Sequence, residues 1–162
     1  MRIDVATYRF AAGMRNADPP TYFGSKYSLP HAAATMVVRG NAGYRALDDS
    51  ALNDPLIAAL RPRVHVAEDP AMSAVAPRLR PARVTVTLKD GRKGTHAVES
   101  HRGDFHRPFE ATELREKFRD LAGEVLTSDG VACAEEMVDR CEEWASVGEL
   151  PRQLRRYGLP QH

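Results

Sequence analysis

The chain opens with a segment in which hydrophobic and polar positions alternate. Ile3, Val5 and Thr7 fall on one side of residues 2–8, and charged or small residues fall on the other. A period of two is typical of a β-strand with one buried face. Residues 2–8 are therefore expected to form a short strand whose inner side carries these three residues.

The clearest alternation lies further along the chain, where valine and leucine alternate with polar residues over residues 84–88. Asp90 and Gly91 follow at once, and an Asp-Gly pair beside an alternating segment favours a hairpin turn. A return strand is therefore expected over residues 94–99. The VHVAED segment that begins at Val64 predicts a further strand.

Signals for a helix frame residues 28–40. Ser28 is a favoured N-cap, Pro30 is tolerated in a first turn, and Gly40 supplies a stop. Residues at helical spacing between them would form a core-facing stripe. This stripe comprises Leu29, Ala33, Met36 and Val37. The preceding residues 11–26 carry prolines and glycines and are expected to form a loop.

Proline marks two further segments. Residues 53–60 predict a short helix that Asn53 or Asp54 caps, with Pro55 in its first turn. Residues 69–81 contain three prolines and are expected to form an irregular crossing loop.

The pattern becomes helical after Pro108. Apolar residues recur at helical spacing from Leu114 to Val125, and a second helix is expected to start at Ser128 and to carry apolar residues through Trp144. Strands thus precede helices along the chain, which favours an α+β fold.

The expected architecture is a small antiparallel sheet packed with helices and followed by C-terminal helices. Its expected division is an α+β domain over residues 1–109 and a helical segment over residues 110–162.

Composition narrows the function classes. The chain has 162 residues, 28% of them charged, with a formal net charge of +1. That balance disfavours a nucleic-acid-binding protein, which would carry a basic face. No apolar run has the length of a membrane span, and the first residues lack the apolar core of a secretory signal. A cytoplasmic protein with no nucleic-acid or membrane partner is expected.

The two cysteines, Cys133 and Cys141, are not expected to form a disulfide. On one helix, residues at this spacing would lie about 12 Å apart along the axis. A disulfide requires Cα atoms less than about 7 Å apart. Both cysteines are therefore expected to be reduced and buried.

A resemblance emerges from the order of several short motifs. A strand ending near Thr7-Tyr8 precedes KYSLPH at residues 26–31 and the stop at Gly40. VTVTLKDG at residues 84–91, a Gly103-Asp104 connection ending in Pro108, and LREKF at residues 114–118 follow in order. Each motif is weak alone, but together, over almost the whole chain, they resemble the C-terminal part of the MmgE/PrpD family. That family includes 2-methylcitrate dehydratases, cis-aconitate decarboxylase and related cofactor-independent lyases and isomerases.

The resemblance implies the fold of a smaller α+β domain that closes like a lid over an active-site cleft, with no cofactor and no metal. Family members are several times longer, and their helical N-terminal domain carries most catalytic residues; its motifs are absent from this sequence. The chain is therefore expected to be a separately encoded half, a truncated gene product or an excised domain. It would need an N-terminal helical domain, which a separate gene could encode, and would then act on a small polycarboxylate. It is also expected to form homo-oligomers, or to bind that domain, through apolar groups after Pro108. These groups include Phe118, Val138 and Trp144.

Four side chains are candidates for the cleft: Tyr8, Lys26, Ser28 and His31. Lys26 or His31 would hold a substrate carboxylate and Ser28 would donate a hydrogen bond, close to the free N–H groups of a helix start. The alternative is that Ser28 is an ordinary cap, Tyr27 is packed, and Lys26 and His31 are solvated. Tyr8 fits equally well as an aromatic residue packed at a sheet edge.

Other polar clusters carry less chemistry. His101, Asp104 and His106 have no recognised ligand spacing, so no metal site is expected there, and Gly103-Asp104 is expected to form a tight turn.

Two functions stay open from the sequence. One is the C-terminal domain of an MmgE/PrpD-type lyase, a dehydratase or decarboxylase that is incomplete on its own. The other is a non-catalytic, stand-alone oligomerising or remnant domain of the same fold.

Overall fold

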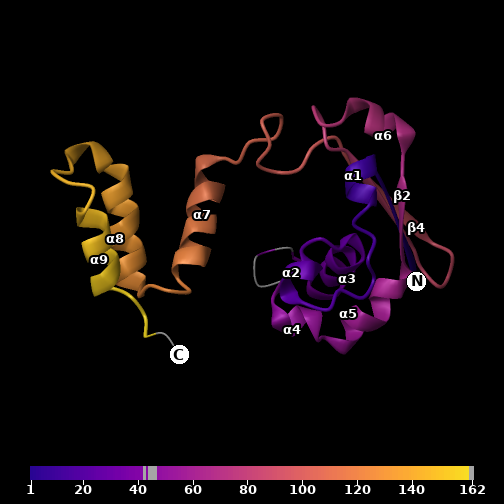
Figure 1. Cartoon of the computed structure of the whole chain (residues 1–162), viewed down its shortest axis with the longest axis horizontal. Helices are drawn as coiled ribbons and strands as arrows, with labels where there is room; N and C mark the ends of the chain where they lie inside the picture. Colours follow the sequence, from indigo (N-terminus) through magenta and orange to yellow (C-terminus); the bar gives the residue numbers. More distant parts are fainter. Residues whose placement is uncertain (42, 44–46, 161–162) are drawn as a thin grey trace. The chain divides into compact units, whose positions relative to one another are not determined.

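A computed structural model describes residues 1–41, 43 and 47–160 of the chain (Figure 1). The chain divides into two compact units, Met1–Pro108 and Phe109–His162.

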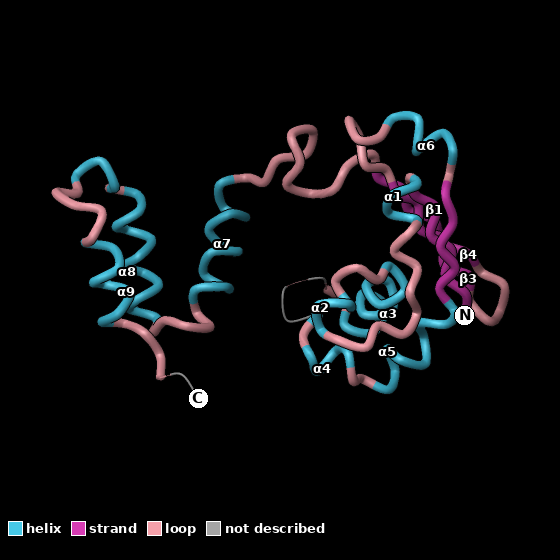
Figure 2. The backbone as a smooth tube through the Cα atoms, in the orientation of Figure 1, coloured by secondary structure: helices cyan, strands magenta, loops and turns pink. Residues whose placement is uncertain are grey.

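The first unit is built around a four-stranded sheet (Figure 2). Its strands are β1 (Arg2–Thr7), β2 (Val64–Glu68), β3 (Ala82–Thr87) and β4 (Lys93–Val98), in the order β2-β1-β3-β4. β3 pairs antiparallel with both β1 and β4, whereas β1 and β2 are parallel. The α+β fold is confirmed, but the expectation of a purely antiparallel sheet is wrong for the β1–β2 pair. Parallel neighbours need a long connection, which here is the helical segment between these two strands.

The inner face of β1 carries the residues that the alternation predicts. Ile3, Val5 and Thr7 are buried, whereas the intervening side chains are wholly or partly exposed. Ile3 lies opposite Val64 of β2 and Val86 of β3, so one isoleucine joins three strands. The core of this unit has buried members from the strands and from the helices that cover them. They are Ile3, Val5, Ala34, Ala51, Ile57, Leu60 and Val64.

The α-helices in the described residues of this unit are short or moderate in length. They are α1 (Arg9–Ala12), α2 (Tyr22–Ser25), α3 (Leu29–Arg39), α4 (Asp49–Leu52), α5 (Pro55–Leu60) and α6 (Pro70–Val75), with a 3₁₀ turn, η2 (Arg61–Arg63), after α5. α3 packs against α5, η2 and β2. Its predicted ends are confirmed: Ser28 is the N-cap, and Gly40 ends the helix with a left-handed φ of 72°. Asp54 caps α5, with Pro55 in its first turn, as expected.

Three expectations for this unit need correction. The buried face of α3 consists of Pro30, His31, Ala34 and Thr35. Met36 and Val37 of the expected stripe are exposed instead. Residues 69–81, expected to be irregular, contain α6, and residues 11–26, expected to be a loop, contain the end of α1 and the whole of α2. Pro70 is at the start of α6, where the missing N–H costs nothing.

The second unit consists of helices. They are α7 (Ala111–Ala122), α8 (Ser128–Asp139) and α9 (Glu149–Arg156), with a 3₁₀ turn, η3 (Cys141–Glu143), after α8. Its buried core is small, with Ala122, Leu126 and Ala134 at the centre. Leu150 and Leu154 of α9 pack against this core.

The helix expected to continue through Trp144 ends at Asp139 instead. Cys133 and Cys141 therefore do not share a helix, and both thiols are free. Cys133 is partly buried and Cys141 is exposed, so the expectation that both are buried is wrong. The indole N–H of Trp144 donates to the carbonyl of Met137 (3.0 Å), which folds the segment after α8 back onto that helix.

Among the helices in the described part of the chain, none has both the length and the apolar character that crossing a membrane requires.

Candidate functional site

Two of the four predicted cleft residues meet at the start of α3. The Ser28 hydroxyl accepts a hydrogen bond from the His31 backbone N–H (3.0 Å) and donates one to the carbonyl of Asn16. Ser28 is buried, and it satisfies one of the free N–H groups of the helix start. Its contacts make Ser28 both the cap of α3 and a tie to the preceding loop.

The side chain of His31 lies inside the first unit, with no exposed surface. Within the described residues, neither ring nitrogen has a hydrogen-bond partner. Burial lowers the pKa of His31, and the positive charges of Arg61 and Arg39 lower it further. The imidazole is thus held neutral and away from the surface of this unit, in contrast to the solvated histidine of the alternative interpretation.

Lys26 lies on the surface, directly after α2. Its ammonium group is 4.2 Å from the centroid of the Tyr22 ring, a cation–π geometry. Tyr27 is exposed rather than packed in the core, and its ring centroid is 5.3 Å from that of Phe23. The segment therefore presents three aromatic side chains and one cation to solvent.

Tyr8 lines a hollow of about 610 Å³ at the end of β1. Among the described residues, no carboxylate contributes to its lining. The lining residues are Tyr8, Arg9, Phe10, Ser73, Ala76, Pro77 and Arg80. The structure thus brings Ser28 and His31 together in the interior, whereas Tyr8 belongs to this hollow and Lys26 to the exposed surface beside Tyr22.

Neighbouring strands position the hollow. β1 and β2 are parallel, so the segments that follow them, α1 and α6, begin at the same edge of the sheet. The Asp69 N–H donates to the Thr7 carbonyl (2.8 Å), and the Arg9 N–H donates to the Ser73 hydroxyl oxygen (2.9 Å). The Ser73 hydroxyl in turn donates to Glu68 (2.8 Å). These bonds fix α1 and α6 side by side along one wall.

Glu68 holds one of the two arginines of the hollow. Its carboxylate lies 3.2 Å from Nε of Arg9. The hydrogen bond from Ser73 lowers the pKa of Glu68 most, and the hydrogen bond and charge of Arg9 lower it further. Glu68 is therefore ionised at neutral pH and orients Arg9.

The loop after β4 forms the expected turn. Gly103 has a φ of 89°, a conformation that favours glycine, and Asp104 forms an isolated bridge with Arg107. Nδ1 of His101 lies 3.6 Å from the Asp104 carboxylate. Across residues 1–41, 43 and 47–160, no group of three or more His, Cys, Asp or Glu side chains is arranged to hold a metal ion.

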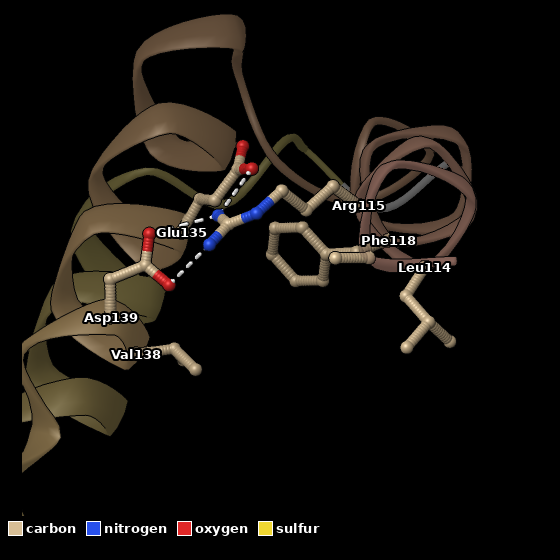
Figure 3. A pocket seen from close by; sticks show the side chains of 7 residues that line it. Leu114, Arg115, Phe118, Glu135, Val138 and Asp139 are labelled. Carbon is tan, nitrogen blue, oxygen red and sulfur yellow. Dashed lines mark hydrogen bonds and ion pairs between the residues drawn. The ribbon is translucent and has the colours of Figure 1, made fainter. Parts of the chain in front are cut away.

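The second unit has a hollow of its own, of about 330 Å³, between α7 and α8 (Figure 3). Its apolar lining comes from Ala111, Leu114, Phe118 and Val138. Arg115 reaches from α7 to the acidic side chains of α8 and limits the hollow on one side. Of the apolar groups expected to be exposed here, Val138 is about half exposed (52%), whereas Phe118 and Trp144 are partly buried.

Comparison with known proteins decides the family. The family model for the MmgE/PrpD C-terminal domain matches residues 1–143, from the first residue to the end of η3. The chain belongs to the MmgE/PrpD family.

Two relatives of known activity within this family are cis-aconitate decarboxylases. The human protein is 24% identical over 143 residues, which are 88% of this chain and 30% of the relative. The mouse protein is 23% identical over 137 residues, which are 85% of this chain and 28% of the relative. The chain thus spans less than a third of the length of the relatives it matches.

The sequence did not reveal three of the polar residues around Tyr8 in this MmgE/PrpD domain. Arg9, Ser73 and Arg80 are far apart along the chain or lie in segments expected to be irregular. The available signal was Asp69-Pro70, which has the same cap and first-turn proline as Asp54-Pro55. A helix placed there would have carried Ser73 to the end of β2.

Proposed function

We propose that this chain is the C-terminal domain of an MmgE/PrpD-type lyase, a dehydratase or decarboxylase that acts on a small polycarboxylic acid. The supporting observation is the family match over residues 1–143. The matched relatives act on cis-aconitate, a tricarboxylate, according to their names. The domain would contribute substrate binding and closure of the cleft, and a larger partner would contribute most of the catalytic groups.

The chemistry of the first unit supports this division of roles. A lyase that acts on a polycarboxylate needs cationic groups for the carboxylates and a base for a carbon-bound proton. The hollow at Tyr8 offers two guanidinium groups and a phenol, but the described residues of its lining include no histidine, lysine or carboxylate to serve as the base. His31 is enclosed in the core of the unit. These groups support a role of the domain in anion binding, and we assign the proton acceptor to the partner.

The partner we propose is a separately supplied N-terminal helical domain. Support comes from the length of the relatives, more than two thirds of which lies outside the matched region. The apolar hollow between α7 and α8 is a surface of suitable character, because Leu114 and Val138 are each about half exposed there. Apolar patches rimmed by polar residues commonly mark protein–protein contacts.

The test is reconstitution. The chain is assayed for decarboxylation of cis-aconitate and dehydration of 2-methylcitrate, alone and co-expressed with the product of the reading frame immediately upstream. Turnover only in the co-expressed sample is the expected result. Turnover by the chain alone would contradict the need for a partner. An upstream frame that encodes no helical domain, together with no turnover in any sample, would favour the non-catalytic oligomerising or remnant domain.

A further inference from the structure

Arg80, which follows α6, is one of the two arginines that line the hollow at Tyr8. The backbone N–H of Arg80 donates to the carbonyl of Glu99 (3.2 Å), which anchors this residue beside the end of β4. Among the described residues, its guanidinium makes no hydrogen bond and no ion pair. The hydrogen bonds from Ser100 and the Phe105 N–H lower the pKa of Asp104 most, and the charge of Arg80 adds a smaller effect from a distance.

The two arginines of the hollow therefore differ. Arg9 is paired with Glu68, which also accepts the Ser73 hydroxyl. Arg80 has no such partner in the described residues, and no acidic side chain lines the hollow to neutralise it. A planar guanidinium with all of its donors free matches the two oxygens of a carboxylate in a bidentate geometry. Arg80 is exposed, so these donors are open to an anion that enters the hollow.

The rest of the lining determines what kind of anion fits. Phe10, Ala76 and Pro77 supply an apolar wall, and the Tyr8 side chain is the remaining polar group. A volume of about 610 Å³ lies within the range of pockets that hold small organic ligands. A carbon skeleton of a few atoms would contact the apolar wall while one of its carboxylates reaches Arg80. An inorganic anion would leave that wall unused.

We propose that Arg80 is the carboxylate-binding residue of this domain, and that the hollow at Tyr8 takes one carboxylate and part of the carbon skeleton of a small polycarboxylic acid. Arg9, which is paired with Glu68, also lines the hollow. The substrate class rests on the proposed function, but the binding step belongs to this chain and does not require the partner.

Binding is tested on the full chain without any partner. Citrate is titrated into the protein and followed by calorimetry, at constant ionic strength, with inorganic phosphate as the second ligand. Arg80→Gln is compared with Arg78→Gln. The control removes the same charge, two residues before Arg80, from a side chain that is not part of the hollow's lining. Arg80→Lys keeps the charge but removes the bidentate geometry.

The expected result is citrate binding that Arg80→Gln weakens at least tenfold, that Arg80→Lys weakens less, and that Arg78→Gln leaves unchanged. Equal losses for the Arg80 and Arg78 variants would overturn the proposal, because they would mean diffuse charge attraction. Phosphate binding as tight as citrate binding, or no binding of either, would overturn it as well.

The same variants separate this inference from the proposed function. If reconstitution gives a lyase, Arg80→Gln is expected to raise KM at least tenfold, and an unchanged KM would overturn the role of Arg80 alone. If citrate binds as expected but no partner yields turnover, the lyase function fails and the carboxylate site stands.

Discussion

Arg115 of α7 and Asp139 of α8 form a two-pronged ion pair. Nη1 lies 2.8 Å from one carboxylate oxygen of Asp139, and Nη2 lies 2.7 Å from the other. Nη1 also donates to Glu135 (2.9 Å), which Arg119 contacts twice from the next turn of α7. The buried apolar core of this unit is small, and this charged network adds a second link between α7 and α8.

Removing Arg115 tests that tie. Arg115→Met is expected to lower the thermal midpoint of the second unit, because Asp139 loses its partner while Glu135 keeps Arg119. The pair is solvent-exposed, so the loss should be largest at low salt and should nearly vanish at about 1 M ionic strength, where the Debye length is about 3 Å. Melting followed by circular dichroism at both ionic strengths checks this. Arg152→Met, on α9 and outside the network, is the control, and a salt-independent loss would argue against the network.

The hollow between α7 and α8 predicts association. Val138 lines it and is about half exposed. A charge at this position should prevent burial against another apolar surface, because desolvating an unpaired carboxylate is costly. Val138→Glu is therefore expected to reduce self-association by at least tenfold in sedimentation equilibrium, or to prevent capture of the helical partner.

The matched control is Val147→Glu, since Val147 is even more exposed but lies in the loop before α9. A wild-type chain that stays monomeric and binds no helical domain would rule out a docking role for this hollow.

The boundaries of α3 were predictable from the sequence, but the face that it buries was not. Caps are local: a serine hydroxyl and a left-handed glycine act on backbone groups within a few residues. Burial depends on what packs against the helix. α3 packs against α5, η2 and β2, buries His31 and Thr35 and leaves Met36 exposed, so ranking residues by hydrophobicity did not identify the buried face.

The candidate site was predictable only in part for a similar reason. Tyr8 was a candidate because it ends a strand, and the strand itself followed from simple alternation. The polar residues around Tyr8 come from segments that follow other strands. Their proximity depends on the parallel pairing of β1 and β2, which a pattern of alternation cannot distinguish from antiparallel pairing.

His31 predicts a pH dependence of stability. Its folded pKa is lowered by burial and then by Arg61 and Arg39, so the unfolded chain binds the proton more readily. The first unit should keep its full stability above about pH 6.5, the ordinary pKa of histidine, and lose stability as the pH falls below it. Urea unfolding followed by circular dichroism between about pH 7.5 and pH 5.5 measures this.

Two variants sharpen the test. His31→Phe removes the titrating group and its unpaired ring nitrogens, so the dependence between these pH values should flatten. His96→Gln changes an exposed histidine of β4 and should leave the pH dependence of the free energy of unfolding unchanged. If the free energy of unfolding of His31→Phe still falls with pH as in the wild type, groups other than His31 cause the dependence.

Ser28 predicts a measurable cost at the start of α3. Ser28→Ala removes the acceptor for the His31 N–H and the donor to Asn16, in a position with almost no exposed surface. Loss of an N-cap costs about 1–2 kcal/mol. Ser28→Thr keeps the hydroxyl and should lose less than half of that in urea unfolding. Equal losses for the two variants would mean that packing, not the hydrogen bonds, is responsible.

Gly130 gives the sharpest prediction for the second unit. A Cβ at this position of α8 would lie 2.4 Å from Cβ of Tyr157 and 3.3 Å from Cβ of Leu126. Alanine would favour the helix by about 1 kcal/mol through its propensity, but two carbon atoms cannot approach this closely. The backbone there is held by a hydrogen bond from the Thr127 N–H to the Tyr157 carbonyl (2.9 Å). Gly130→Ala should therefore destabilise the unit by about 1–3 kcal/mol, as overpacking does.

The identity of the clashing atom determines the control. Tyr157→Ala retains Cβ, so it should not reduce the destabilisation caused by Gly130→Ala. Tyr157→Gly removes that atom, so the free-energy changes of Tyr157→Gly and Gly130→Ala should be less than additive. Denaturant unfolding followed by the fluorescence of Trp144 reports on this unit alone, because Trp144 is the one tryptophan in the chain. If Tyr157→Ala reduces the destabilisation caused by Gly130→Ala, the clash involves the aromatic ring. If the free-energy changes of Gly130→Ala and Tyr157→Gly are additive, the close approach of α8 to Tyr157 does not explain the need for glycine at residue 130.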